Sequence, residues 1–164
     1  MTESVCPGCG LIGPIEEGPT HAYMLASPLC WRRFNAIMTR EYETPALMPT
    51  HFLAVDAYAA QHPGDSDEPR ARQSVWIHLA GLVAVLREGH APEYRYDLLR
   101  RLARDVAVFP PPPSHAPFPI VANDVAAPHS LARHSEAMRE WAEATVTAYE
   151  TASPDLARQI ETLR

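Results

Sequence analysis

Residues 27–42, SPLCWRRFNAIMTREY, decide the fold class, because they combine the clearest helix pattern of the chain with one of its three cysteines. Serine is a favoured N-cap residue, and proline is tolerated at the first helical position because its missing N–H would have no partner there. Apolar side chains then recur at helical spacing at Trp31, Phe34, Ile37, Met38 and Tyr42. The stretch predicts a helix that begins after Ser27 and carries Cys30 in its first turn.

Similar patterns, interrupted by proline and glycine, predict further helices downstream. Pro45 and Pro49 should break the first helix, and a second should run from near Thr50 to His62. We expect a third helix over 72–87, a fourth after 92, a long one after 128 and a short one from 153. The sequence therefore predicts an all-α protein, a five- to six-helix bundle forming a single domain, 1–164, with the helical body in 27–164.

Residues 109–119 contain six prolines and form neither a helix nor a central strand in this prediction. Such a stretch should cross the surface as an extended chain. We favour a stiff connection between helices, since proline-rich segments often act as rigid spacers. A docking motif for a partner protein is the alternative.

The three cysteines and one histidine lie within the first thirty residues, in the pattern C-x2-C-x11-H-x8-C. Cys6, Cys9, His21 and Cys30 have the residue types and spacing of one tetrahedral zinc site. Residues 1–26 are therefore expected to form an irregular zinc knuckle in front of the helices. His21 is the fourth ligand by position, and His51 is the reserve.

Two alternatives to a structural zinc site stay open. The cysteines could be unrelated buried thiols, although the Cys6-Pro7-Gly8-Cys9-Gly10 form is fairly specific for metal. If His21 is not a ligand, a three-cysteine site would keep an open coordination position and could be catalytic. Four protein ligands would instead close the shell, and we prefer that structural interpretation.

Polar residues also fall on apolar faces of the predicted helices. Asp56 shares a helix face with Phe52 and Leu53, and an antiparallel helix hairpin places it opposite residue 77 or 78, where His78 lies on an apolar face. A buried carboxylate is costly unless it is paired. We expect one pocket with candidate catalytic roles for Asp56, His62, Gln73, His78 and His134. The alternative is that Asp56 and His78 merely satisfy each other in the core.

Composition narrows the function classes. A net charge of −6 argues against a nucleic-acid binder. No signal peptide precedes the knuckle, and the longest apolar run, 75–86, is too short to span a membrane. We therefore expect a cytoplasmic protein with reduced cysteines and no membrane contact. Phosphate-loop and dinucleotide-binding motifs are absent from the sequence, so zinc is the cofactor expected.

Several stretches resemble a family of small bacterial proteins of unknown function. They are the CPGCG knuckle at 6–10, THAY at 20–23, SPLCW at 27–31, VDAYAAQHPG at 55–64 and QSVWIHL at 73–79, with a weaker match toward the C-terminus. The resemblance implies that the knuckle and the group of Asp56, Gln61, His62, Gln73 and His78 belong to one recurring design. It supplies no reaction.

Two hypotheses about function follow. The first is a small metal-dependent enzyme that binds a small molecule in the Asp/His/Gln pocket. The second is a non-catalytic, zinc-stabilised module that holds a protein partner.

Overall fold

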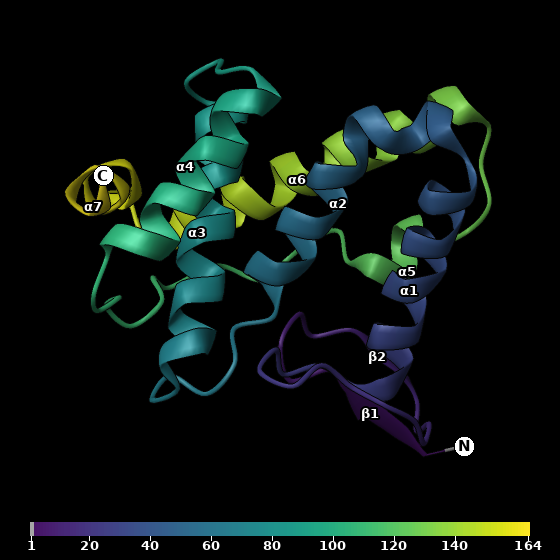
Figure 1. Ribbon diagram of the computed structural model, residues 1–164. Coiled ribbons are helices and arrows are strands. Elements are labelled where there is room, and N and C mark those ends of the chain that lie inside the picture. Colours follow the sequence, from purple (N-terminus) through teal and green to yellow (C-terminus); the bar gives the residue numbers. More distant parts are fainter. Residues whose placement is uncertain (1) are drawn as a thin grey trace.

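The computed structural model describes residues 2–164, most of which lie in helices (Figure 1). The helices are α1 (Pro28–Glu43), α2 (Met48–Gln61), α3 (Pro69–Leu86), α4 (Pro92–Asp105), α5 (Ala122–Val125), α6 (Leu131–Ala152) and α7 (Leu156–Leu163), with a 3-10 turn, η1 (Pro45–Leu47), before α2. Two short strands, β1 (Glu3–Val5) and β2 (Ile12–Pro14), form an antiparallel hairpin. The predicted all-α class is confirmed. The described residues form seven helices instead of five or six, the additional one being the four-residue α5, and a small hairpin stands where irregular chain was expected.

Local sequence signals explain where the helices begin. The Ser27 hydroxyl accepts a hydrogen bond from the Cys30 N–H at 3.2 Å, so the predicted N-cap of α1 is present. The first helix ends at Glu43, before Pro45 and Pro49, as predicted. Pro49 itself lies in the first turn of α2, where a proline needs no N–H partner. Helix α2 therefore starts at Met48, two residues earlier than predicted.

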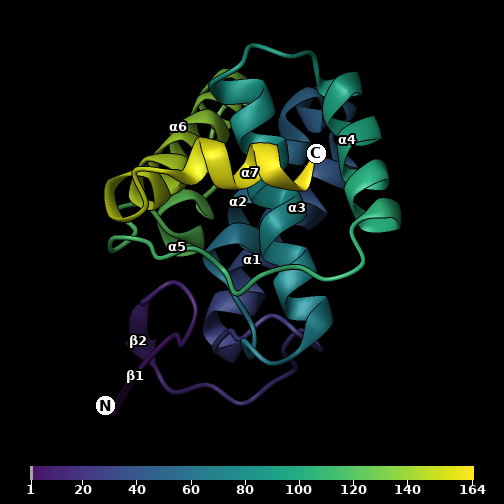
Figure 2. The same cartoon turned by 90° about the vertical axis from the view of Figure 1, so that its left-hand side faces the viewer.

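Helix α2 lies at the centre of the molecule. Helices α1, α3 and α6 all pack against it, and nearly every residue from Phe52 to Gln61 is buried. Helix α3 runs back along α2. Helices α4 and α7 pack on the side of α3 that faces away from α2 (Figures 1 and 2). This arrangement explains why apolar residues occur on nearly every face of α2, since a helix enclosed on several sides is apolar nearly all round.

The proline-rich segment 109–119 contains no helix or strand, as predicted, and hydrogen bonds hold it against the helices. The Trp76 indole N–H donates to the carbonyl of Pro110 at 2.9 Å. The Ala116 N–H donates to the carbonyl of Ala148 at 2.8 Å. These bonds join the segment to α3 and α6, so it acts as a fixed connection across the helical body.

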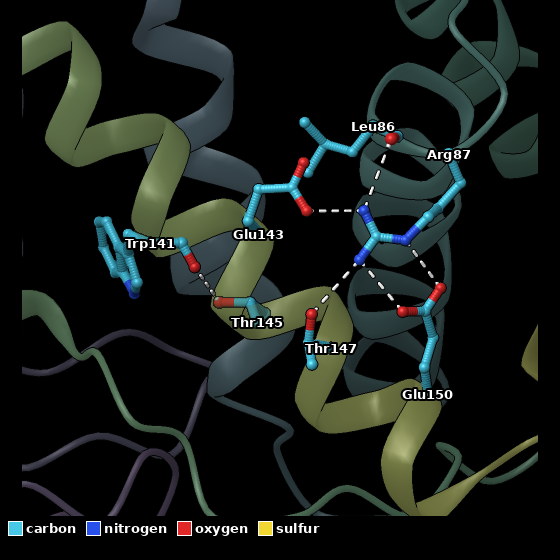
Figure 3. Close-up of polar contacts among 7 residues, drawn as sticks. All are labelled: Leu86, Arg87, Trp141, Glu143, Thr145, Thr147 and Glu150. Atoms are coloured by element: carbon cyan, nitrogen blue, oxygen red, sulfur yellow. Dashed lines mark hydrogen bonds and ion pairs between the residues drawn. The ribbon is translucent and has the colours of Figure 1, made fainter.

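Arg87 closes the far end of α3 against α6 (Figure 3). Its guanidinium donates to Glu150 at 2.9 and 3.1 Å and to Glu143 at 2.6 Å. Single exposed ion pairs contribute about 0.2–1 kcal/mol each, but a forked arginine shared by two carboxylates has better geometry than most.

None of the helices in residues 2–164 is both long and apolar enough to cross a bilayer.

Candidate metal centre

The turn between β1 and β2 holds Cys6 and Cys9 close together. The Cys6 N–H donates to the Leu11 carbonyl at 2.8 Å, and the Gly10 N–H donates to the Cys6 carbonyl at 3.0 Å. Gly10 has a φ of 80°, a conformation that side chains other than glycine rarely adopt. Both thiols of the hairpin are buried, at 2% and 6% exposure.

Cys30 approaches these thiols from the first turn of α1. Its Sγ lies 3.6 Å from Cys9 Sγ, and the Ser27 N–H points at Cys6 Sγ at 3.4 Å. Two thiolates bound to one tetrahedral ion at ~2.3 Å would lie about 3.8 Å apart. The observed separation fits a shared ion, and it is far longer than the ~2.05 Å of a disulfide bond.

His62 supplies the fourth donor. Its Nε2 lies 3.2 Å from Cys30 Sγ, and its Nδ1 lies 2.7 Å from the Tyr58 carbonyl. A carbonyl can only accept, so Nδ1 carries the proton and the Nε2 lone pair faces the thiols. Metal-bound histidines are generally fixed in this way by a partner on the other ring nitrogen. The Tyr58 ring also stacks on the imidazole, with centroids 3.9 Å apart.

The four donor atoms form one compact group. The Sγ atoms of Cys6, Cys9 and Cys30 and a ring nitrogen of His62 all lie within 4.8 Å of one another, and all four residues are buried. No other group of three or more histidine, cysteine or acidic donors meets this criterion in residues 2–164. A set of three thiols and one imidazole suits zinc, which favours tetrahedral sulfur and nitrogen ligands.

The thiols influence one another strongly. Hydrogen bonds from Cys30 and Cys9 hold the pKa of Cys6 far below its ordinary value. The pKa of Cys30 is raised by its hydrogen bonds to Cys6 and Cys9, and burial raises it further. Three buried thiols can therefore share about one negative charge among themselves, whereas a divalent cation at their centre would favour the thiolate form of each.

Gly8 allows the hairpin to reach His62. A Cβ at this position would lie 2.5 Å from His62 Cδ2 and 2.5 Å from the Leu25 carbonyl oxygen. Real Cβ contacts are essentially never this short. The glycine in the CPGC sequence is therefore required for close approach to the end of α2.

The structure does not place His21 with the cysteines, although the sequence spacing favoured it as the fourth ligand. Its Nδ1 accepts from the Tyr23 N–H at 3.3 Å, and its ring packs against Tyr23 and Trp31. Burial lowers the pKa of His21. His51, the reserve ligand, lies elsewhere and contacts Glu41. The geometry thus moves the fourth position to His62, which sequence analysis had placed in the catalytic pocket.

The predicted pairing of Asp56 with His78 is present in the structure. His78 Nδ1 lies 2.6 Å from Asp56 Oδ1, across the α2–α3 hairpin. Arg95 of α4, which sequence analysis missed, also forms a two-pronged ion pair with Asp56, with Nε 2.8 Å from Oδ2. Asp56 and Arg95 are 0% and 5% exposed, so the buried carboxylate has both a cation and an imidazole as partners.

His134 lies in a different cluster. Its Nε2 is 2.8 Å from Glu41 Oε1, while His51 Nδ1 is 2.7 Å from Glu41 Oε2. Arg40 reaches His134 Nδ1 at 3.4 Å, which makes that nitrogen the acceptor and Nε2 the donor to Glu41. Glu41 is fully buried and was not predicted; it links α1 with α2 and α6.

The five predicted pocket residues therefore separate into three places. Asp56, Gln73 and His78 stay near one another, because Gln73 and His78 line the same small cavity and Asp56 lies behind His78. His62 joins the cysteines, and His134 joins Glu41. A signal for His62 was present in the sequence: an apolar helix ends there at a histidine followed by Pro63-Gly64. No comparable pattern marked Arg95 or Glu41.

Comparisons with known proteins add one finding to this geometry. No curated protein and no solved structure gives a match to the chain. A family model described as a family of unknown function, DUF5946, matches residues 4–150, which include all four donors and the Asp56–His78 pair. The chain therefore belongs to this family of unknown function, DUF5946.

Proposed function

We propose that the protein binds one zinc ion through Cys6, Cys9, Cys30 and His62, and that this ion fastens the N-terminal hairpin to the helical body. The observation that carries the proposal is the convergence of four buried donors within 4.8 Å from three parts of the chain. Cys6 and Cys9 come from the hairpin, Cys30 from the start of α1 and His62 from the end of α2. The proposal requires reduced thiols, which agrees with the cytoplasmic location expected from the sequence.

The ligand set supports a structural role for the ion. Four protein ligands complete a tetrahedral shell and leave no position for substrate or activated water. The hairpin contributes few apolar contacts to the core beyond Leu11 and the cysteines themselves. Zinc binding would therefore supply much of the free energy that orders residues 2–26. In this respect the proposal agrees with the hypothesis of a zinc-stabilised module.

Metal analysis of variants tests this proposal. The parent protein should contain one zinc per chain, and Cys9→Ser and His62→Ala should each lose most of it. We expect the free energy of unfolding to fall by roughly 3–5 kcal/mol when the site is lost. His21→Ala is the matched control and should retain its zinc, because His21 lies outside the donor group. Loss of zinc in His21→Ala with retention in His62→Ala would overturn the assignment.

A second candidate function, a small enzyme, is supported by the Asp56–His78 pair. A carboxylate that holds Nδ1 of an imidazole orients the other ring nitrogen for proton transfer. His78 is partly exposed, with 19% of its side chain accessible, and it lines a cavity. In this candidate function the reacting groups would lie on α3, and zinc would only stabilise the surrounding structure.

A further inference from the structure

One edge of α3 presents polar side chains to a small cavity. Arg70, Ser74 and His78 follow one another at four-residue spacing, so they lie along one edge of the helix over two turns. The cavity has a volume of about 70 Å³ and is lined by Tyr23, Arg70, Gln73, Ser74, Ile77 and His78. We call it the α3 cavity.

The polar groups along this row have unused hydrogen-bonding capacity. Among residues 2–164, the Arg70 guanidinium has no ion-pair or hydrogen-bond partner and only lies over the Tyr23 ring, 5.3 Å from its centroid. The Ser74 hydroxyl makes no hydrogen bond within the described chain, although Ser74 is only 5% exposed. His78 uses Nδ1 for Asp56, which leaves Nε2 for a ligand. Ser74 is buried and His78 is half-buried, and polar groups in such positions normally use their hydrogen-bonding capacity. The free Ser74 hydroxyl and the free Nε2 of His78, beside the unpaired guanidinium of the exposed Arg70, therefore indicate a ligand.

The charges around the α3 cavity favour an anion. Asp56 is the acidic group that faces His78, and Arg95 from α4 neutralises it through a two-pronged ion pair. Arg70 therefore contributes positive charge that no acidic side chain of the described residues pairs with. When His78 is protonated, Nδ1–H donates to Asp56 and Nε2–H becomes a second charged donor.

We propose that the α3 cavity binds a small oxyanion, the carboxylate or phosphate group of a small molecule. Arg70, the Ser74 hydroxyl and protonated His78 would donate to it, and the Gln73 amide lies at the same wall. A volume of about 70 Å³ is roughly that of two waters, which suits such a group and not a whole metabolite. A second cavity of about 270 Å³ shares Arg70 and Gln73 and extends to Phe109, where the rest of the molecule would lie.

This inference goes beyond the zinc proposal, but the two are connected through Tyr23. Tyr23 belongs to the N-terminal segment, and its carbonyl packs against Gly64, where no Cβ would fit. The segment between the hairpin and α1, which the proposed zinc ion would help to order, therefore supplies one wall of the α3 cavity. A test of anion binding must therefore be made on zinc-loaded protein, with the zinc content measured for every variant.

Sulfate and formate are the probes, because sulfate represents a tetrahedral group and formate a planar one, and both keep a constant charge through neutral pH. We expect sulfate or formate, added at constant ionic strength against chloride, to shift the NMR signals of the His78 ring and the Ser74 amide.

Arg70→Gln should weaken binding about tenfold, which is the effect of one charge-assisted hydrogen bond. Ser74→Ala should weaken it less.

Arg100→Gln is the matched control, since Arg100 is an exposed arginine on α4 with no ion pair among the described residues. Its affinity for the probes should equal that of the parent. The proposal is overturned if neither anion shifts the His78 signals more than chloride does, or if Arg70→Gln and Arg100→Gln weaken binding equally. If the protein shows either of these results while it contains one zinc per chain, only the anion proposal fails. The zinc proposal is tested separately, by the zinc content of His62→Ala.

Discussion

Gly8 and His62 form the contact on which the metal site depends most closely. The glycine lies against the imidazole, and even one added methyl group would push the hairpin away from the end of α2. Sequence analysis identified the Cys6-Pro7-Gly8-Cys9-Gly10 form as typical of a metal site. The structure adds a steric reason, because the backbone of the hairpin must pass within contact distance of His62.

Gly8→Ala should therefore weaken zinc binding, since the added Cβ displaces either Cys9 or His62. We expect a loss of about 1–3 kcal/mol in the free energy of unfolding of the zinc-loaded protein, as for other overpacked sites. Competition with a chromophoric chelator gives the zinc affinity. Gly89→Ala serves as the control, because Gly89 has a φ of 72° but no neighbour within 4 Å of a Cβ. Gly89→Ala should lose stability through backbone strain and keep the parent's zinc affinity. Equal zinc affinities of Gly8→Ala and Gly89→Ala would contradict the steric argument.

Helices α2, α3 and α4 are joined by the buried group of Asp56, His78 and Arg95. Gly81 permits their close approach, because a Cβ there would lie 3.1 Å from Asp56 Oδ2 and 2.9 Å from Leu99 Cδ1. Removing one member of a buried ion pair leaves the other charge without compensation in the core. The group therefore determines how these three helices pack.

Asp56→Asn should lower the free energy of unfolding by about 3–5 kcal/mol, because Arg95 would stay buried without its counterion. Zinc content should remain at one per chain, since Asp56 lies outside the donor group. Asp97→Asn removes an exposed carboxylate of α4 that makes no ion pair in the described chain, and it should change stability by less than about 0.5 kcal/mol. Denaturant unfolding of both variants checks this, and equal effects would refute the buried pairing.

Glu41 has the corresponding role for α1, α2 and α6. Both of its carboxylate oxygens accept from imidazoles, those of His51 and His134. Glu41→Gln would turn one acceptor into a donor facing a histidine N–H, and we expect it to cost about 3 kcal/mol. Glu43→Gln, two residues later and exposed, is the control and should be nearly neutral. A melting temperature of Glu41→Gln equal to that of Glu43→Gln would show that the buried contacts contribute nothing.

At the scale of the whole molecule, the proposed zinc ion would connect the N-terminal segment to the body, while the helices would pack without it. Removing zinc with a chelator should free the hairpin and leave most helical circular dichroism unchanged. A glutamate-specific protease should then cut after Glu16 or Glu17, which lie between β2 and α1. The first arginine is Arg32, so trypsin reports only on the helical body and should show little change. Cleavage at Glu16 and Glu17 at the same rate with and without zinc would contradict this connection.

The sequence was sufficient for features that depend on local pattern. The start of the first helix after Ser27 followed from capping chemistry, and that of the fourth helix from the proline at 92. The Asp56–His78 pair followed from helical periodicity and a short hairpin. Features that depend on how the helices pack could not be predicted from the sequence. His62 lies 32 residues beyond Cys30 in sequence and reaches it only because α1 and α2 fold back on each other. Arg95 joins Asp56 from a third helix whose packing no local pattern specifies.

The most direct test of the account is X-ray absorption spectroscopy at the zinc edge on protein purified without added metal. We predict a four-coordinate shell with three sulfurs at ~2.3 Å and one imidazole nitrogen at about 2.0–2.1 Å. His62→Ala should lose most of its zinc, and any zinc that remains should lack the imidazole nitrogen, whereas the shell should be unchanged in His21→Ala. A protein without zinc, or a shell built only of oxygen and nitrogen, would contradict the claim that Cys6, Cys9, Cys30 and His62 hold one ion.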